Sequence, residues 1–551
     1  MTTTIYLARR ILTMNPRQPE ATAVAVRDGR ILGVGELADL LQWDKASTVD
    51  ERFKDKVLMP GLIEGHCHLK EGGMWAWTYL GWFDRRDPSG HVWPGLKSMQ
   101  AVTARLVEVD AEMTAKGVSQ EQPLLAWGFD PIYFGDERMT VEHFAQANLT
   151  RPIVISHANG HLMNVNASML KIAEITAATN IDGVVKDQAG QPTGELQEPS
   201  AMHLVIRKIG QAGLLSPMDD QGMLNFSAIA CMQGVTTATD LVNDYSEHSV
   251  GMLERATSRD DYRVRLFAAF RAFHGAKAAH ESVEHIRTLI DRNTDKLQFG
   301  LVKMMLDGSI QGFSARLKWP GHFNGAPNGI WVMDPQQYEQ DLEIYHRAGL
   351  QVHTHTNGDQ ASEVAIEATE RVLNRHPQVD HRHTLQHGQM IDAAMFRKMS
   401  RLGMCANLFS NHVWYWGDQH YEMTMGPDRA NRIDDARAAL DYGVPLAIHS
   451  DAPVTPLGPF FTAWCAVNRV TPKGRILGAN HRLTVAEALF AITMGAAWTL
   501  KADHDIGSIE LGKRADFAVL EDDPLEIEPS KLKDVRIWGT VLGGNIFQAG
   551  R

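Results

Sequence analysis

Two histidines lie two residues apart in the segment Met59–His68, which reads Met-Pro-Gly-Leu-Ile-Glu-Gly-His-Cys-His. Apolar residues precede the pair, so we expect a short buried strand that ends in His66 and His68. Because side chains two apart on a strand point to the same side, one metal ion could take a ring nitrogen from each at about 2.0–2.1 Å. The alternative is two ordinary polar residues at a strand end, since a His-x-His pair alone is a weak signal.

Further groups that can bind metal follow at the ends of later predicted strands. Lys303 lies in Val-Lys-Met-Met-Leu-Asp-Gly, His355 ends a His-Thr-His run, and His387 and Asp451 end two later strands. Together with the first strand, five strands deliver imidazole, amine or carboxylate groups to one end. Each residue taken alone could be an ordinary polar residue with a hydrogen-bond partner. Their coincidence at strand ends predicts a metal site.

The strands that carry these groups belong to a repeat in which a strand is followed by an amphipathic helix. We count eight such strands, at residues 58–68, 234–240, 262–270, 298–307, 351–357, 383–388, 403–409 and 445–451. Eight strand–helix units predict an α/β fold with a parallel (β/α)8 barrel of the TIM type, whose reactive groups lie at the carboxyl ends of the strands. Thr484-Val-Ala-Glu487 has the pattern of a capping box at the start of an outer helix.

Two regions fall outside this repeat. Residues 1–57 and 500–551 alternate apolar and polar positions between turn signals, so we expect them to form one small β-sandwich domain. Residues 75–230 separate the first barrel strand from the second and are far too long for an ordinary connection. We expect an insertion domain that caps the barrel mouth, which leaves residues 58–74 and 231–499 for the metal-binding barrel.

Composition narrows the class of partner. The chain has 551 residues, of which 44% are hydrophobic, and a net charge of −12 without a dense cluster of Lys or Arg. This argues against a surface for nucleic acid or anionic membrane. The 4 cysteines are scattered without a Cys-x-x-Cys pair, which is typical of a reduced, cytoplasmic protein. No apolar run approaches the roughly 18 residues of a membrane span, and the N-terminus lacks a signal-peptide pattern.

The strand-end motifs resemble those of the metal-dependent amidohydrolase superfamily, and within it the branch of N-substituted formamide deformylase-like hydrolases. The resemblance covers essentially the whole chain. Its carriers in the barrel are residues 60–68, 303–308, 355–359, 386–389 and 450–453. In the insertion, Trp127–Asp130, Gly160-His161 with Asn166, and Thr193–Glu198 are also similar to that branch. The tail at residues 507–516 is shared by much of the superfamily, so it supports the fold more than the substrate.

Carried over residue by residue, the resemblance implies two divalent ions, with zinc the expected metal. The implied ligands are His66, His68 and Asp451 for one ion, and His355 and His387 for the other. Lys303 would bridge the two ions as a carbamate formed with CO₂, because a free ammonium offers only donors whereas a carboxylated lysine offers anionic oxygens. The alternative for Lys303 is an ion pair, for example with Asp307, and a site with one metal.

Some positions depart from the pattern of the branch. Gln386 stands where the branch often has Glu, and His449 stands where a small residue is usual. His449 could hydrogen-bond near Asp451 or simply pack, and the sequence leaves both open. His353 lies on the same strand face as His355, but the match to the motif favours His355 as the ligand.

The expected activity is that of a metal-dependent hydrolase acting on carbon–nitrogen bonds other than peptide bonds. A divalent ion lowers the pKa of bound water towards ~7, which makes hydroxide available. Asp451 would accept its proton and return it to the leaving group, while His161 or the second ion would polarise the scissile carbonyl. The leading substrate is an N-acyl or N-formyl amine. The alternatives are a lactone, ester or carbamate hydrolase, a deaminase with one metal, and a barrel that has lost its ligands and has a structural role.

The residues expected to contact the substrate are Trp127, Glu198, Asp307 and Trp414. Aromatic residues follow the first and seventh barrel strands closely, where they could grip a flat, aromatic substrate. They could equally pack the insertion onto the barrel, and Glu198 could instead lie at a helix start without contacting the substrate.

For location and partners, we expect a cytoplasmic homo-oligomer, a dimer, that acts on a small molecule and binds neither nucleic acid nor membrane.

Overall fold

The computed structural model separates the chain into two compact units, and each is described by itself. One contains residues 1–68 and 227–551, and the other residues 69–226. The structure describes residues 3–43, 46–135, 137–209, 218–272 and 275–550.

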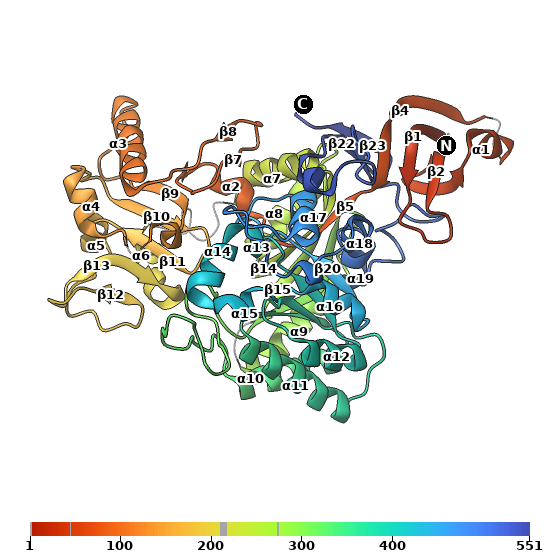
Figure 1. Cartoon of the computed structure of the whole chain (residues 1–551). Helices are drawn as coiled ribbons and strands as arrows, with labels where there is room; N and C mark the ends of the chain where they lie inside the picture. Colours follow the sequence, from red (N-terminus) through yellow and green to blue (C-terminus); the bar gives the residue numbers. More distant parts are fainter. Residues whose placement is uncertain (1–2, 44–45, 136, 210–217, 273–274, 551) are drawn as a thin grey trace. The chain divides into compact units, whose positions relative to one another are not determined.

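Eight parallel strands of the first unit form one sheet, in the order β20-β19-β18-β17-β16-β15-β14-β5 (Figure 1). They are β5 (Leu62–Cys67), β14 (Val235–Asn243), β15 (Arg265–Arg271), β16 (Leu297–Met305), β17 (Gln351–Thr356), β18 (Thr384–His387), β19 (Cys405–Leu408) and β20 (Leu446–Ile448). The first and last strands meet at their carboxyl ends, where the His68 N–H donates to the Ala452 carbonyl at 2.7 Å and the Asp451 N–H to the His66 carbonyl at 3.1 Å. The sheet is therefore nearly closed, and the predicted barrel is confirmed.

Helices alternate with these strands. The helices of this unit include α8 (Glu247–Thr257), α9 (Ala276–Ile290), α10 (Pro335–Arg347), α11 (Asp359–Arg375), α12 (Ala393–Leu402), α16 (Ala436–Asp441), α17 (Pro459–Asn468), α18 (Val485–Ala491) and α19 (Met494–Thr499). In α11 the residues Ala361, Ala365, Ala368 and Val372 are buried, and this spacing places them on one helical face. The capping box of α18 is confirmed, because Thr484 and Glu487 each bind the other's backbone N–H.

Both ends of the chain contribute to a second sheet in the same unit. Its order is β23-β22-β21-β4-β1-β2-β3, with β1 (Thr4–Leu12), β2 (Glu20–Arg27), β3 (Arg30–Gly35), β4 (Thr48–Pro60), β21 (Phe517–Leu520), β22 (Ile537–Leu542) and β23 (Asn545–Gln548). The two ends join where β4 pairs antiparallel with β21, with Pro60 opposite Phe517. Its sandwich form stays a prediction.

The boundary between the two sheets differs from the predicted first strand at residues 58–68. Strand β4 continues to Pro60, and the barrel strand begins at Leu62. The chain changes sheets at Gly61, whose N–H donates to the Asp516 carbonyl at 2.8 Å, while the Leu62 N–H donates to the Gly234 carbonyl at 3.0 Å. A Cβ at Gly61 would lie 1.8 Å from Thr236 Oγ1, so only glycine fits this crossing.

The second unit has a six-stranded sheet of its own, in the order β12-β13-β11-β10-β9-β6. Its members are β6 (Thr78–Tyr79), β9 (Leu124–Phe129), β10 (Ile153–His157), β11 (Leu162–Val165), β12 (Val184–Lys186) and β13 (Pro192–Gln197), and its helices include α3 (Met99–Ala115), α4 (Val141–Gln146), α5 (Ala167–Ile172) and α6 (Glu198–Ile209). Strands β9 and β10 pair in parallel, with Ile153 opposite Leu124. That this unit caps the barrel stays a prediction.

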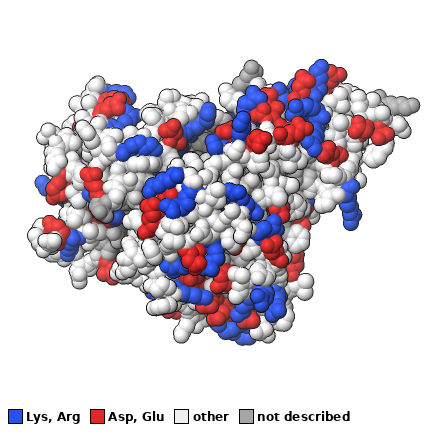
Figure 2. Space-filling model, viewed as in Figure 1, with Lys and Arg blue, Asp and Glu red and all other residues white. Residues whose placement is uncertain are grey.

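Two surface properties bear on the expectations for partners. On the face shown in Figure 2, basic and acidic side chains are interspersed. Among the described residues, no helix combines the length and the apolar character that a membrane crossing requires.

Candidate metal centre

The structure brings three predicted imidazoles to one carboxylate at the carboxyl end of the barrel. Asp451 Oδ1 lies 3.3 Å from His66 Nε2 and 3.1 Å from His68 Nε2. Asp451 Oδ2 lies 3.8 Å from His387 Nδ1. The ligand atoms of His66, His68 and Asp451 all lie within 4.8 Å of one another, a spacing that one metal ion could bring together.

Two of these residues have a backbone conformation that side chains rarely adopt. His387 has φ 68° and Asp451 has φ 52°, both in the left-handed region. Such a conformation costs about 1–3 kcal/mol in a non-glycine residue and clusters at functional sites. The strain therefore marks the ends of β18 and β20 as places where side-chain direction matters more than local stability.

Lys303 and His355 complete the predicted ligand set. The ring centroid of His355 lies 4.5 Å from that of His387. Lys303 is buried, and its Nζ makes no hydrogen bond or ion pair with any described residue, so the alternative ion pair with Asp307 is absent. Burial lowers the pKa of Lys303 to about 7, although the charge of Asp451 raises it. Much of the amine is therefore unprotonated near neutral pH, the form that reacts with CO₂.

Asp307 has a different set of partners. Its Oδ1 accepts from the Asn357 N–H at 2.9 Å, and its Oδ2 accepts from the N–H groups of Gly358 and Arg316 at 2.8 and 3.0 Å. The carboxylate is fully buried. It therefore fixes the loop that begins after Thr356, the last residue of β17. The expected substrate contact of Asp307 stays a prediction.

A buried amide sets the proton position on His66. The Asn407 amide donates to Gln386 Oε1 at 2.9 Å, so this oxygen is an acceptor and the His66 Nδ1–H donates to it at 2.8 Å. The proton on Nδ1 leaves the Nε2 lone pair free on the side of Asp451. Gln386 Nε2 in turn donates to His353 Nδ1 at 2.7 Å, which makes His353 a neighbour of the ligand set. Sequence reasoning missed Asn407, although it pairs with Gln386 in the barrel register.

Two further acids near the centre were missed from the sequence. Glu64 is fully buried and accepts from Ser450 Oγ at 2.7 Å, and burial raises the pKa of Glu64 to about 8. The sequence signal for Glu64 was its position as an acidic residue within the apolar run that precedes His66. Asp240 in β14 lies 4.0 Å from His68 Nδ1. The hydrogen bond between Ser450 and Glu64 links β5 to the segment that follows β20.

Burial also sets the charge state of the histidines. It lowers the pKa of His66 and of His387 well below the ordinary value, and the nearby Lys303 acts in the same direction. Both imidazoles are therefore neutral at neutral pH. Neutral imidazole is the form that binds metal.

The predicted site residues of the insertion have partners within the second unit. His161 Nδ1 lies 3.0 Å from Glu198 Oε2, so these two predicted residues form a pair. Trp127 is fully buried, with its ring centroid 5.2 Å from that of Trp75 and 5.0 Å from that of Tyr79. Their expected roles towards the substrate stay predictions.

Trp414 belongs to the first unit and lies in a group of aromatic rings. Its centroid is 5.2 Å from that of Trp464 and 6.3 Å from that of Phe461. The ring is half-buried. Part of its surface is thus available to a substrate, and the rest packs against α17.

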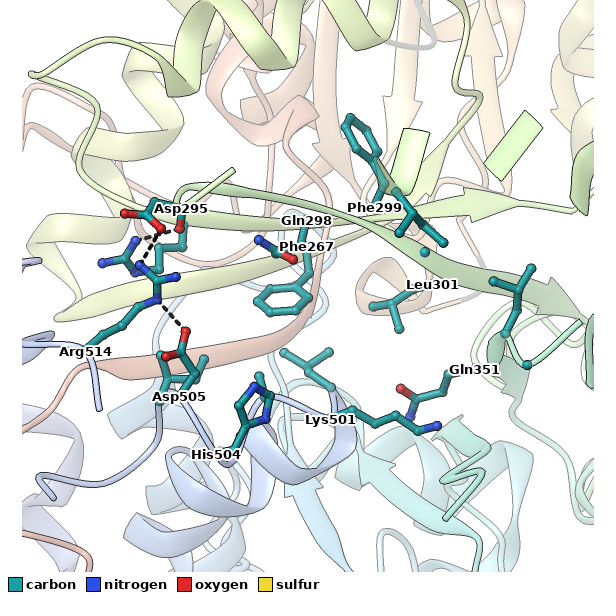
Figure 3. A pocket seen from close by; sticks show the side chains of 18 residues that line it. Phe267, Asp295, Gln298, Phe299, Leu301, Gln351, Lys501, His504, Asp505 and Arg514 are labelled. Carbon is teal, nitrogen blue, oxygen red and sulfur yellow. Dashed lines mark hydrogen bonds and ion pairs between the residues drawn. The ribbon is translucent and has the colours of Figure 1, made fainter. Parts of the chain in front are cut away.

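A cavity of about 390 Å³ lies at the opposite end of the barrel, where β15, β16 and β17 begin (Figure 3). Phe267, Leu301 and Gln351 line it, and Arg514 at its edge is paired with Asp505. The amino-terminal face of such barrels serves stability, whereas chemistry takes place at the carboxyl-terminal face. We therefore place the functional site at the histidines and Asp451.

The side chains present fit a divalent cation. His387 Nδ1, Lys303 Nζ and Asp451 Oδ1 are buried, and none makes a hydrogen bond with the part of the chain that the structure describes. A buried polar atom without a partner costs about 1–3 kcal/mol. Imidazole and carboxylate are ligands that zinc and similar ions accept. The barrel and its site thus define the class of metal-dependent hydrolases.

Comparison with known proteins gives the family. The chain belongs to the amidohydrolase family, whose model matches residues 53–548. It is 26% identical to the putative amidohydrolase YtcJ of Bacillus subtilis, over 97% of each chain. It is 23% identical to the N-substituted formamide deformylase of Arthrobacter pascens, over 97% of this chain and 96% of that one. Among solved structures, an uncharacterized metal-dependent hydrolase from Pyrococcus horikoshii has a TM-score of 0.71 at 19% identity, over 96% of this chain and 99% of that one.

Proposed function

We propose that this metal-dependent hydrolase cleaves an amide-type C–N bond in an N-acyl or N-formyl amine. The observation that carries the proposal is the Asp451 carboxylate, 3.1–3.3 Å from the imidazoles of His66 and His68. A base beside metal-binding imidazoles is what hydrolysis of an unactivated amide requires. The similarity to the deformylase of Arthrobacter pascens supports the N-formyl class.

Different residues of the chain have different roles in the proposed reaction. A divalent cation held at the centre would act as a Lewis acid and supply water of lowered pKa. Asp451 accepts a proton from the attacking water and then donates it to the leaving nitrogen, which departs as a neutral amine. Gln386 keeps the Nδ1 proton on His66, so that Nε2 continues to face Asp451.

The proposal includes two cations in the centre, with zinc the expected metal. His355 and His387 would hold the second cation, and their ring centroids lie 4.5 Å apart. Lys303 would bridge the two cations as a carbamate, formed when its amine nitrogen attacks CO₂ and releases a proton. The unpartnered, buried Nζ of Lys303 supports this role.

The test is a substrate panel on zinc-replete protein. N-formyl and N-acetyl derivatives of one aromatic amine are compared with a matched ester, lactone and carbamate. We expect the highest kcat/KM for an amide, and Asp451→Asn protein purified in parallel reports contaminating hydrolases. Faster turnover of the ester or lactone than of every amide would overturn the amide assignment.

A further inference from the structure

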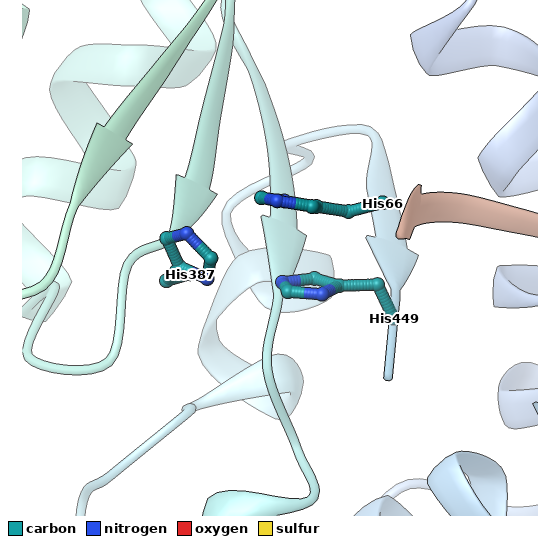
Figure 4. A group of neighbouring side chains, drawn as sticks. All are labelled: His66, His387 and His449. Carbon is teal, nitrogen blue, oxygen red and sulfur yellow. The ribbon is translucent and has the colours of Figure 1, made fainter. Parts of the chain in front are cut away.

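The cavity at the amino-terminal end of the barrel is separate from the metal centre. It lies where β15, β16 and β17 begin, and its volume is about 390 Å³ (Figure 3). The metal centre lies at the carboxyl end, near His66 and His387, where the ring of His449 stacks on that of His66 at a centroid distance of 4.6 Å (Figure 4). Small-molecule sites have volumes of roughly 300–1,000 Å³. The cavity can therefore hold a small ligand that takes no part in the chemistry.

One wall of the cavity holds an amide oxygen without a partner. Gln351, the first residue of β17, is buried, and its Nε2 donates to the carbonyls of Arg382 at 2.6 Å and Thr499 at 2.9 Å. Because two carbonyls require a donor, the other amide atom is the oxygen. This Oε1 is buried and makes no hydrogen bond with the part of the chain that the structure describes. In Figure 3 the amide points into the cavity, so a ligand that donates a hydrogen bond would satisfy this acceptor.

Lys501 supplies the cavity with a positive charge. Arg265 and Arg514 also line it, but each is paired with an aspartate. Lys501 is half-buried, and its ammonium forms no ion pair within the described chain. The charge of Asp380 acts on it, but that carboxylate is bound to Arg382 at 2.6 Å. An anion in the cavity would therefore find a cation that is not already neutralised.

The backbone of Lys501 is also unusual. Helix α19 has Leu500 as its C-cap, and Lys501 follows in the left-handed region with φ 56°. Glycine is the usual residue at this place, because a side chain there costs local stability. A role for the lysine side chain in binding explains why the position is not a glycine.

Apolar side chains form another part of the lining, among them Phe267 and Leu301. We propose that the cavity binds a small carboxylic acid that has a hydroxyl group and an apolar body. The carboxylate would pair with Lys501, the hydroxyl would donate to Gln351 Oε1, and the apolar body would lie against Phe267. The two polar groups of the ligand should be close together, because Gln351 is bonded to the carbonyl of Thr499, two residues before Lys501.

The first test compares three probes on the full-length, zinc-loaded protein. Mandelate has a carboxylate, an adjacent hydroxyl and a phenyl ring, whereas phenylacetate lacks the hydroxyl and benzyl alcohol lacks the carboxylate. Saturation-transfer NMR titrations in the millimolar range give the Kd of each probe. We expect mandelate to bind at least about fivefold more tightly than either of the others, since each lacks one polar contact. Equal affinities, or no binding of mandelate, would overturn the proposal.

A second test removes the charge. Lys501→Met keeps most of the apolar stem, so it should weaken mandelate binding about tenfold and leave the affinity for benzyl alcohol unchanged. Lys501→Arg restores the charge and should restore binding. Lys531→Met is the matched control, because Lys531 is an exposed lysine of the same unit that does not line the cavity. Equal losses in Lys501→Met and Lys531→Met would show that only the net charge matters.

A third test locates the ligand. Gln298 lies opposite Phe267 in the barrel register, and both line the cavity. Gln298→Trp should fill the space and abolish mandelate binding. Binding that persists in both Gln298→Trp and Lys501→Met would place mandelate elsewhere, for example on the zinc of the metal centre, and would contradict the proposal. Thermal unfolding reports whether the variants fold, and Gln298→Phe provides the same comparison if Gln298→Trp does not.

Discussion

At the scale of single residues, Asp451 combines strain, burial and charge. Its backbone has φ 52° and its carboxylate faces three imidazoles. We expect Asp451→Asn to lower kcat by at least ~10², because general-base catalysis is worth ~10²–10⁴ in rate. Asn keeps the shape and tolerates the left-handed backbone, so the protein should fold. The measurements are kcat and zinc content. A variant that binds its metal and keeps more than about a tenth of wild-type activity would show that another residue is the general base.

The carbamate on Lys303 can be observed directly. Metal-replete protein equilibrated with ¹³C-labelled bicarbonate should show a carbamate carbon in its NMR spectrum, because the buried amine has no other partner among the described residues. Lys303→Met should lose this signal. Lys513→Met is the matched control and should keep the signal. Lys513 is also buried, but its Nζ donates to Ser508 Oγ at 2.6 Å. A signal that survives in Lys303→Met would place the carbamate on another residue.

At the scale of elements, the crossing between the two sheets depends on one glycine. A Cβ at Gly61 would lie 1.8 Å from Thr236 Oγ1 and 2.6 Å from Thr236 Cβ, so rotation of the threonine would not relieve the overlap. We expect Gly61→Ala to cost about 1–3 kcal/mol in unfolding free energy and to lower the Tm. Gly35→Ala is the control, because the nearest atom to its Cβ lies at 4.0 Å. Equal Tm values for the two variants would contradict this account.

A chain of histidines joins α10 to the start of β18. The Val352 N–H donates to His383 Nδ1 at 3.1 Å, so His383 Nε2 carries the proton and donates to His346 Nδ1 at 3.0 Å. His346 Nε2 donates to the His376 carbonyl at 2.8 Å. Every nitrogen is thus used in its neutral form, and burial lowers the pKa of His383 well below the ordinary value.

This chain predicts acid sensitivity. Because the folded-state pKa of His383 is depressed, its contribution to stability is present above about pH 6.5 and is lost as the pH falls below that value. Between the pKa of His383 in the folded protein and its pKa in the unfolded chain, the unfolding free energy falls by up to about 1.4 kcal/mol per pH unit. In metal-free protein, His383→Gln should have a lower Tm than wild type at pH 7.5 but a smaller fall in Tm between pH 7.5 and 5.5. Parallel falls would show that His383 does not titrate on unfolding.

At the scale of the whole molecule, the prediction that residues 75–230 cap the active site can be tested through His161. It pairs with Glu198 at 3.0 Å within that unit. If His161 polarises the scissile carbonyl, His161→Ala should lower kcat/KM by about 10²–10³. His203→Ala, which removes an exposed histidine of the same unit, should have no effect. An unchanged kcat/KM in His161→Ala would make His161 a structural residue.

The sequence alone was sufficient for the barrel and the gathering of its predicted ligands. Strand periodicity places His66 and His68 on one side, and parallel strands deliver their last residues to one edge, so His387 and Asp451 must approach them. These conclusions follow from local patterns, which can be read directly along the sequence.

Other features depended on which side chains meet across strands, and only the tertiary structure decided them. Asn407 donates to Gln386, and this contact fixes the proton on His66. Lys303 has no ion pair in the described chain, which removes an alternative that its sequence left open. His449 could have packed or bonded, and its stacking on His66 became visible only when β5 and β20 were brought together. Such roles arise from non-local contacts, so no spacing along the chain encodes them.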